Sequence, residues 1–440
     1  MRDGTVTVVA GLGSGCSRTV QELGKQAPSQ WQIDARNGIT RLKPRVWDRT
    51  TSSWVEIALP TGEEEEGDAF LGSGAAAHLA LRIATYNVWF SRRNWRARAR
   101  AVFRLLRGDG DPPFDVVALQ EVTPRFLFLL REEAFVRRAY VLSDVLGTTF
   151  IGKPETAYGV LLLIKRDLVV GRAAAAAPPP FVLRSLAMHA LPSQMARRVA
   201  VVVLDATAAA GASGPRCRRI AIATVHLESL GYRRVRVAQL EAIGRILDAT
   251  DAGTALVCGD FNCAPDSDGD AAPPEEQASA RAPAQRGASE NETFAALGFF
   301  DLWPLLRGPG ARGVTLPLPL GAAEALRGSG AGASAISTVE HHARIDRIIL
   351  RRRDESGAVP LSIAMFGDVS VASVLGVGAR GSDGAGDGAG DAAGELSGEE
   401  GGGRRSSKLP SSADAHCALA LERPSDHLGL RAVLKWANRP

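Results

Sequence analysis

Residues 255 to 262 read Ala-Leu-Val-Cys-Gly-Asp-Phe-Asn. The run 255–258 is apolar and predicts a buried strand, and the strand ends at the carboxylate of Asp260 and the amide of Asn262. Such a polar pair commonly forms only a turn. It is also what a ligand site at the rim of a sheet requires.

The same arrangement recurs on both sides of this stretch. Apolar strands are predicted at residues 81–89, 114–121, 219–227, 344–350 and 427–434. The polar residues at the ends of these strands are Asn87, Glu121, His226, Asp346 and His427. Together they supply hard oxygen ligands, a base and hydrogen-bond donors, which is what a metal-assisted hydrolase needs.

Helical periodicity separates several of these strands. Apolar residues recur at helical spacing in 94–107, and a second helix is expected at 233–247. Further strands are expected at 158–164 and 198–206. The alternation predicts an α/β fold of layered sheets and helices.

Composition limits the protein class. The chain has 440 residues, of which 45% are hydrophobic, enough for a sizeable core. The five cysteines are scattered without a C-x-x-C pair, so neither a zinc site nor a disulfide framework is expected. No apolar run reaches the roughly 20 residues that span a bilayer, so we expect an intracellular protein with no membrane partner.

Domain boundaries follow the changes in composition. Residues 1–80 are expected to form a segment of unknown role, partly disordered, and 81–437 the main domain. Two low-complexity inserts, 266–291 and 376–412, carry too little apolar surface to offset the entropy of ordering, so they are expected to be flexible loops.

The ordered set of motifs resembles the endonuclease/exonuclease/phosphatase superfamily. The motifs are Tyr86-Asn87, Gln120-Glu121-Val122, His226-Leu227-Glu228-Ser229, Gly259-Asp260-Phe261-Asn262, Arg344-Ile345-Asp346-Arg347-Ile348 and Ser425-Asp426-His427. Within it, the His-Leu-Glu-Ser form, Arg236-x-x-Gln239, the segment 181–197 and Phe300-Asp301-Leu302-Trp303 are most similar to the tyrosyl-DNA phosphodiesterase 2 group. The resemblance implies a four-layer α/β sandwich, with two packed mixed β-sheets flanked by helices.

The resemblance also implies roles for single residues. Mg²⁺, or Mn²⁺ in its place, would be held by Glu121 with Asn87 and Asp426 nearby. Asp260 would activate water and Asn262 would hold the phosphate. His427, oriented by Asp346, would stabilise the phosphorane, and His226 would donate to phosphate oxygens. Substrate contacts are expected from Ser229, Arg236 and Trp303.

The expected reaction is hydrolysis of a phosphodiester, with DNA carrying a 5′-phosphotyrosyl end as the leading substrate. This would make the chain a nuclear DNA-repair enzyme that acts as a monomer on topoisomerase-derived adducts. A general nuclease, an RNA deadenylase and a phosphoinositide phosphatase remain open as alternatives on the same scaffold. An inactive DNA-binding module is the alternative from another class.

Two departures from the group's pattern concern its substrate contacts. The first motif reads Tyr86-Asn87-Val88-Trp89, and Cys263-Ala264-Pro265 follows Asn262 where that group carries a phosphate-binding arginine.

Residues 91–107 hold seven arginines and no acid. That run is either a solvated helix face or a surface that attracts a nucleic-acid backbone.

Overall fold

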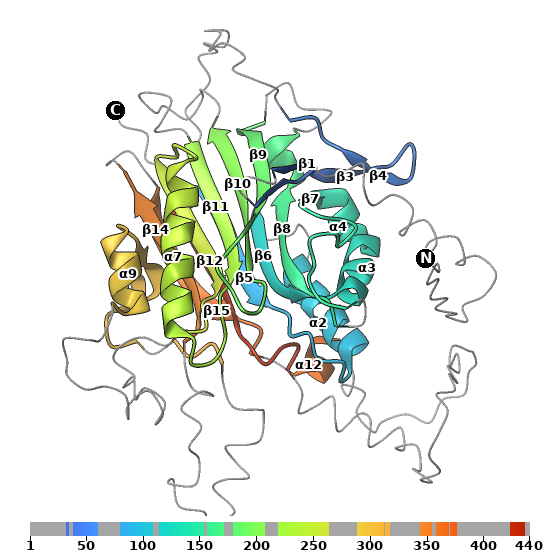
Figure 1. Cartoon of the computed structure of the whole chain (residues 1–440). Helices are drawn as coiled ribbons and strands as arrows, with labels where there is room; N and C mark the ends of the chain where they lie inside the picture. Colours follow the sequence, from blue (N-terminus) through green and yellow to red (C-terminus); the bar gives the residue numbers. More distant parts are fainter. Residues whose placement is uncertain are drawn as a thin grey trace, which may run out of the picture.

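The chain was analysed as a computed structural model. It describes residues 32–34, 38–59, 80–108, 114–153, 156–170, 179–206, 219–263, 288–311, 313–316, 344–353, 358–368, 370–375 and 423–435. Within these ranges, strands of two sheets form the centre and helices cover their outer faces (Figure 1).

The first sheet has the strand order β1-β2-β9-β10-β11-β12-β14-β13. Its strands are β1 (Gln32–Asp34), β2 (Ile39–Arg41), β9 (Phe181–Ala190), β10 (Arg198–Ala206), β11 (Arg219–His226), β12 (Thr254–Asp260), β13 (Phe300–Asp301) and β14 (Asp346–Arg352). Its β11 and β12 run parallel and the other neighbours antiparallel, so the sheet is mixed.

The second sheet has the order β15-β16-β5-β6-β8-β7-β3-β4. Its strands are β3 (Arg45–Asp48), β4 (Ser53–Glu56), β5 (Ala80–Asn87), β6 (Val116–Val122), β7 (Tyr140–Leu142), β8 (Gly159–Lys165), β15 (Val359–Phe366) and β16 (Gly429–Lys435). Here β5 and β6 are the parallel pair.

The helices lie on the outer faces of the two sheets. Those beside the first sheet are α7 (Arg233–Asp248) and α9 (Glu290–Ala296). Those beside the second are α2 (Trp95–Arg107), α3 (Pro124–Glu132) and α4 (Ala134–Ala139). Shorter helices are α5 (Arg166–Val169), α10 (Leu302–Arg307) and α12 (Val371–Leu375).

Alternate residues of the central strands pack on opposite sides, which gives three apolar layers. In β5, Leu81 and Ile83 belong to the core between the sheets, whereas Ala84 and Tyr86 pack under the helices. Because both faces of the central strands are buried, their sequences are nearly continuous apolar runs. The expected four-layer α/β sandwich is therefore confirmed.

The two sheets begin before residue 81, where the main domain was expected to start. β2 pairs with β9 in the first sheet, and β3 pairs with β7 in the second. Leu42 and Val46 are buried in the core between the sheets. Residues 38–56 thus extend both sheets and bury apolar side chains with them.

Several predicted elements agree with the structure within a few residues, and the helices expected at 94–107 and 233–247 are α2 and α7. The strands that were not predicted are β1, β2, β3, β4, β7, β9, β13 and β15. The insert expected at 376–412 lies outside the described residues, as does 266–287 of the other insert. The insert predicted at 266–291 extends too far, because residues 290 and 291 belong to α9. This helix begins with a capping box formed by Ser289 and Glu292.

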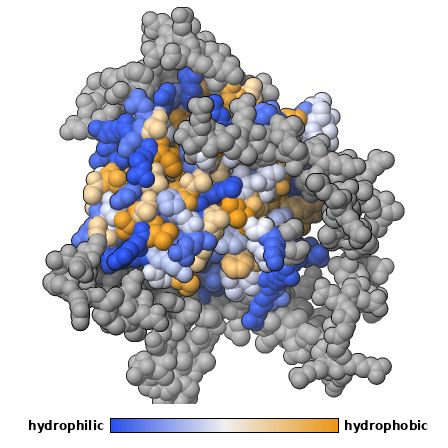
Figure 2. Space-filling view, in the orientation of Figure 1, coloured by the Kyte–Doolittle hydropathy of each residue, from blue (hydrophilic) through white to orange (hydrophobic). Residues whose placement is uncertain are grey.

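Hydrophilic and hydrophobic residues are interspersed over the part of the described surface that Figure 2 shows. No described helix is both long and apolar enough to cross a bilayer.

Candidate active site

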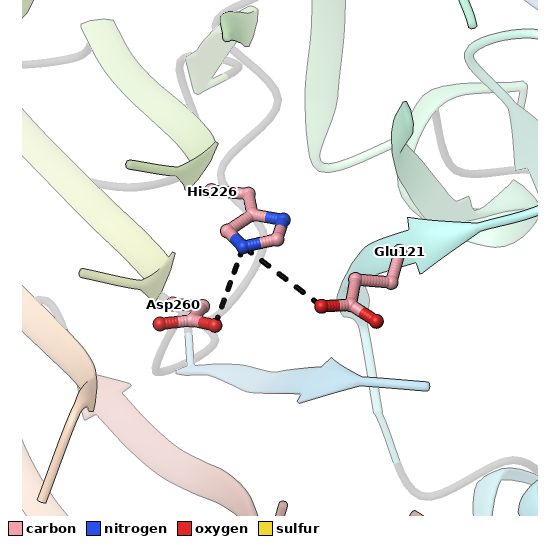
Figure 3. Close-up of side chains that lie close together, drawn as sticks. All are labelled: Glu121, His226 and Asp260. Atoms are coloured by element: carbon pink, nitrogen blue, oxygen red, sulfur yellow. Dashed lines mark ion pairs between the residues drawn. The ribbon is translucent and has the colours of Figure 1, made fainter. Parts of the chain in front are cut away.

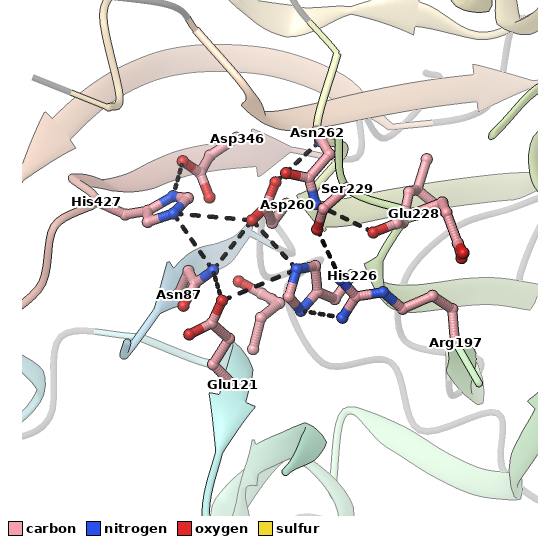
Figure 4. A network of polar contacts seen from close by, with 12 residues as sticks. Asn87, Glu121, Arg197, His226, Glu228, Ser229, Asp260, Asn262, Asp346 and His427 are labelled. Atoms are coloured by element: carbon pink, nitrogen blue, oxygen red, sulfur yellow. Dashed lines mark hydrogen bonds and ion pairs between the residues drawn. The ribbon is translucent and has the colours of Figure 1, made fainter. Parts of the chain in front are cut away.

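The polar strand ends meet at one end of the sandwich, between the two sheets (Figure 4). In the first sheet, His226, Asp260 and Asp346 are cross-strand neighbours in consecutive register on β11, β12 and β14. In the second sheet, Asn87 ends β5 beside β6, which carries Glu121. His427 precedes β16 by two residues.

Asn87 connects the side chains contributed by the two sheets. Its Nδ2 donates to Glu121 Oε1 at 3.2 Å and to Asp260 Oδ2 at 3.0 Å, and lies 3.4 Å from His427 Nε2. The backbone N–H of Trp89 donates to Asn87 Oδ1 at 3.0 Å. Since that N–H can only donate, it fixes the amide with its nitrogen toward the cluster. Asn87 is thus a hydrogen-bond donor in this arrangement, and its oxygen is turned away from a cation beside Glu121.

Glu121 is held in a strained backbone conformation. Its φ is 58°, and the β6–β8 register is interrupted between Leu119 and Val122. A non-glycine residue in the left-handed region costs about 1–3 kcal/mol and is typical of functional sites. The Phe90 backbone N–H donates to Glu121 Oε2 at 2.8 Å, which fixes the carboxylate.

His226 lies between two carboxylates, as Figure 3 shows. Its Nε2 is 3.5 Å from Asp260 Oδ2 and 3.9 Å from Glu121 Oε1. On its other side, Nδ1 is 2.9 Å from the Arg197 guanidinium, which can only donate. Nδ1 is therefore the acceptor and Nε2 carries the proton of the neutral ring. His226 is placed to donate toward the cluster and not to ligate a metal through Nε2.

His427 forms a buried pair with Asp346. Its Nδ1 is 2.8 Å from Asp346 Oδ2, while its Nε2 lies 3.8 Å from Asp260 Oδ2 and 4.0 Å from Asp426 Oδ1. Asp426 is the more open of these acids, with 39% of its side chain exposed. The Ser425 hydroxyl donates to the Asn87 carbonyl at 2.6 Å, which ties the loop before β16 to the end of β5.

Burial and mutual repulsion perturb the pKa values of the cluster. Burial raises the pKa of Glu121 and that of Asp426. Burial, together with the charges of Asp346 and Glu121, raises the pKa of Asp260 to about 7, although His427 opposes the shift. Burial and the charge of Arg197 lower the pKa of His226 well below its usual value.

The pKa of His427 moves in the opposite direction. Burial disfavours its charged form, but the carboxylates of Asp346, Asp260 and Asp426 outweigh burial and raise its pKa well above the usual value. The site therefore contains a cationic imidazole beside a neutral one.

The donor set fits a hard divalent cation. A carboxylate oxygen of Glu121 and one of Asp260 lie within 4.8 Å of each other, as do one of Asp260 and one of Asp346. The buried Oδ1 of Asp346 has no hydrogen-bond partner among the described residues. A cation would offset the repulsion that raises the carboxyl pKa values, and oxygen-rich sites of this kind suit Mg²⁺. Asp426, the other expected ligand, lies outside these two carboxylate pairs, although its charge helps to raise the pKa of Glu121.

The segment between β9 and β10 brings in an arginine that the sequence patterns did not single out. Arg197 donates to Ser229 Oγ at 2.7 Å and to the Tyr158 hydroxyl at 3.2 Å, besides its contact with His226. The buried carboxylate of Glu228 accepts from Ser193 and from the backbone N–H groups of 194 and 195, and so fixes the segment that carries Arg197. The only sequence signal was the motif that ends at residue 197.

Two of the expected substrate contacts lie elsewhere. Arg236 is buried, bonds Glu290 at 2.8 Å, and donates to the carbonyls of Glu228 and Leu230. It therefore holds the loop after β11 and does not reach the cluster. Trp303 is buried in the core between the sheets and donates to the Ala311 carbonyl at 2.9 Å, so it is a packing residue.

The remaining expected residues are near the cluster. The backbone N–H of Asn262 donates to Asp260 Oδ1 at 2.9 Å, and its side-chain nitrogen donates to the Leu227 carbonyl at 3.0 Å. Its side-chain oxygen is thereby left on the side away from the Leu227 carbonyl. Ser229 reaches the cluster through Arg197.

A sequence model of the Endonuclease/Exonuclease/phosphatase family matches residues 84–427. This range includes every residue of the cluster. The chain belongs to this family. Membership agrees with the motif order and with the two-sheet fold. No curated protein sequence matches the chain.

Solved structures of several family proteins are similar to this one. *D. rerio* TDP2 complexed with single strand DNA product has 17% identity and a TM-score of 0.44, over 81% of this chain and 98% of that chain. Truncated *Caenorhabditis elegans* TDP2 has 15% identity and a TM-score of 0.45, over 81% and 98%. The human Nocturnin catalytic domain with bound sulfate anion has 15% identity and a TM-score of 0.44, over 81% and 94%.

Proposed function

We propose that this chain is a divalent-metal-dependent phosphodiesterase that removes tyrosyl adducts from the 5′ ends of DNA. The observation that carries the hydrolytic part is the convergence of Asn87, Glu121, Asp260 and His427 from the two sheets within hydrogen-bonding or ion-pair distance. The family's fold and the oxygen-rich donor set support a metal-assisted reaction at this point.

The cluster divides the chemical work among its members. A bound Mg²⁺ would neutralise charge on the phosphate oxygens and lower the pKa of a coordinated water. Asp260, whose pKa of about 7 suits a base at neutral pH, accepts the proton of the attacking water. The cationic His427 donates to the developing phosphorane, and Asp346 keeps its ring oriented and charged.

The phosphate oxygens are bound on the opposite side of the cluster. His226 donates through Nε2, and Ser229 and Arg197 supply further donors. Arg197 would take the place of the arginine that is missing after Asn262, where Cys263 follows. Asn262 would donate the second N–H of its side-chain amide to the phosphate, since the other N–H is bound to the Leu227 carbonyl.

A hollow beside His226 supports the tyrosyl part of the proposal. It has a volume of about 340 Å³, and its lining combines apolar side chains with those of Thr149, Thr156, Arg197 and Arg198. Its aromatic wall is the stacked pair Phe90 and Tyr158, with ring centroids 5.2 Å apart and planes 9° apart. Met188 and Met195 line it as well, and sulfur packs well against an aromatic ring. A phenolic leaving group matches this flat, apolar space next to the phosphate donors.

The test is turnover of a 5′-phosphotyrosyl oligonucleotide against the same oligonucleotide with a plain 5′ phosphate, an RNA and a soluble phosphoinositide. With Mg²⁺ we expect release of tyrosine and a 5′-phosphorylated product, with kcat/KM at least about 100-fold above the other substrates. EDTA and Asp260→Asn should each abolish release. Higher kcat/KM on plain DNA, RNA or the phosphoinositide would refute the tyrosyl assignment.

The hollow can be tested on its own. Ile151→Trp narrows it from beside the Tyr158 bridge, so it should lower kcat/KM for the tyrosyl substrate more than for the same oligonucleotide with a 5′-methyl phosphate ester, whose leaving group is not aromatic. Equal losses on both substrates would mean that the hollow does not receive the leaving group.

A further inference from the structure

The exposed side of α2 carries a row of arginines outside the active-site cluster. Of the seven arginines in residues 91–107, Arg98 is buried and the other six are exposed. Arg96, Arg100 and Arg104 follow one another at i, i+4 spacing, and Arg107 continues the row. Residues four apart lie on the same helix face, so these side chains project together.

Helix stability does not account for this row. Like charges at i, i+4 repel each other, and α2 has no acid in its first turn to balance them. Arg104 and Arg107 in the last turn interact favourably with the helix dipole, but Arg96 and Arg100 do not. The buried Arg98 has a separate structural task, since it donates to the backbone carbonyls of Trp89 and Ser91.

A depression precedes the row, and a second hollow lies at its far end. Arg92, four residues before Arg96, lines the depression together with Glu121. At the far end, Arg100, Arg104 and Arg107 line a hollow of about 310 Å³ together with Phe103, Leu375 and a single acid, Glu133. Arg104 also donates to the Val374 carbonyl at 2.8 Å, which fixes α12 beside α2.

The surface picture agrees with this placement. Figure 2 shows strongly hydrophilic residues gathered at the lower right of the described part, where Figure 1 places α2 and α12.

We propose that the arginine row of α2 binds the phosphate backbone of duplex DNA beyond the scissile bond. The inference rests on the proposed function for the identity of the substrate. At 1.5 Å per residue, the eleven steps from Arg96 to Arg107 span about 17 Å, which matches about five base pairs at 3.4 Å each. Contacts of this kind hold the duplex in register without reading its sequence.

The experiment compares two charge-removing double variants. Arg100→Gln/Arg107→Gln removes two members of the row, and Arg234→Gln/Arg245→Gln removes two exposed arginines from α7 beside the other sheet. Binding of a fluorescently labelled, unmodified 20-base-pair duplex is measured by anisotropy over a salt series in metal-free buffer. The α2 variant should weaken binding roughly tenfold and reduce the slope of log K against log salt by about 1.8, since each lost phosphate contact contributes about 0.9. The α7 variant should bind as the unaltered chain does.

Activity assays separate this inference from the proposed function. The α2 variant should keep its rate on bis(p-nitrophenyl) phosphate, and its KM should rise only for duplexes that extend about five base pairs or more from the cleaved end. If the α2 variant loses DNA binding as expected, but the unaltered chain has no activity on tyrosyl DNA, only the proposed function is refuted. An unchanged salt slope in the α2 variant, or equal losses of DNA affinity in the α2 and α7 variants, would overturn the inference about α2. The inference would also be overturned if the α2 variant bound DNA normally and lost only its binding to anionic lipid vesicles.

Discussion

Replacing Asp346 with Asn should reduce catalysis through His427. The Asp346 carboxylate contacts His427 Nδ1 at 2.8 Å, and both side chains are buried, so solvent screens the pair little. An opposite charge at this range shifts a pKa by about 1–3 units, and the variant should lower the pKa of His427 by that amount. Removing the same charge also lowers the pKa of Asp260, whose ionised form Asp346 disfavours.

Both limbs of the pH–rate profile should therefore move to lower pH. The descending limb reports loss of the His427 proton, and the ascending limb reports ionisation of Asp260. On the alkaline side, where the variant loses the His427 proton at a lower pH than the unaltered chain does, kcat should fall by about 10²–10³, the usual cost of losing one transition-state donor.

The assay is the pH dependence of kcat on bis(p-nitrophenyl) phosphate at saturating Mg²⁺. His427→Gln supplies the comparison, and the double variant should be no slower than His427→Gln because the pair acts as a unit. Asp346→Asn with near-unaltered kcat and an unshifted descending limb would refute this reasoning.

Two further predictions concern the scaffold around the site. Arg236→Met removes the 2.8 Å partner of the buried Glu290 carboxylate and leaves it the 3.5 Å ion pair with Arg233, so the free energy of unfolding measured in urea should fall by about 1–3 kcal/mol. The double variant with Glu290→Leu should recover much of that loss, and full stability of Arg236→Met would contradict the role assigned to it. At Gly259, with φ +143°, an added Cβ would lie 2.0 Å from the Val225 carbonyl oxygen. Gly259→Ala should displace Asp260 and abolish turnover, and wild-type kcat in a folded Gly259→Ala protein would show that the close approach is not needed.

The positions of the cluster residues could be predicted because their signals are local. An apolar strand ending in Asp260 or His226 is visible in a few residues, and sheet register then brings such ends together. The direction of the Asn87 amide could not be predicted. It depends on the Trp89 N–H, whose position follows from the turn after β5.

Long-range pairing explains the errors in assigning arginines. Arg236 looks like a substrate contact in sequence, but its partner Glu290 lies 54 residues away and belongs to another helix. Arg197 lies at the start of a strand without a distinctive pattern. Only the anchoring of its segment by Glu228 brings it to His226.

The N-terminal strands were missed for a related reason. β2 has three residues and β3 has four, too short for periodicity to stand out. Their stability comes from partners far along the chain, β9 and β7, which no local pattern specifies.

The central claim is that the clustered carboxylates bind a divalent cation, and Mn²⁺ titration followed by electron paramagnetic resonance tests it directly. The free Mn²⁺ signal should be suppressed saturably by the unaltered chain and by Glu132→Gln, which changes an exposed acid on α3. Glu121→Gln should leave the free signal almost undiminished. Equal Mn²⁺ binding by Glu121→Gln and the unaltered chain would contradict the account.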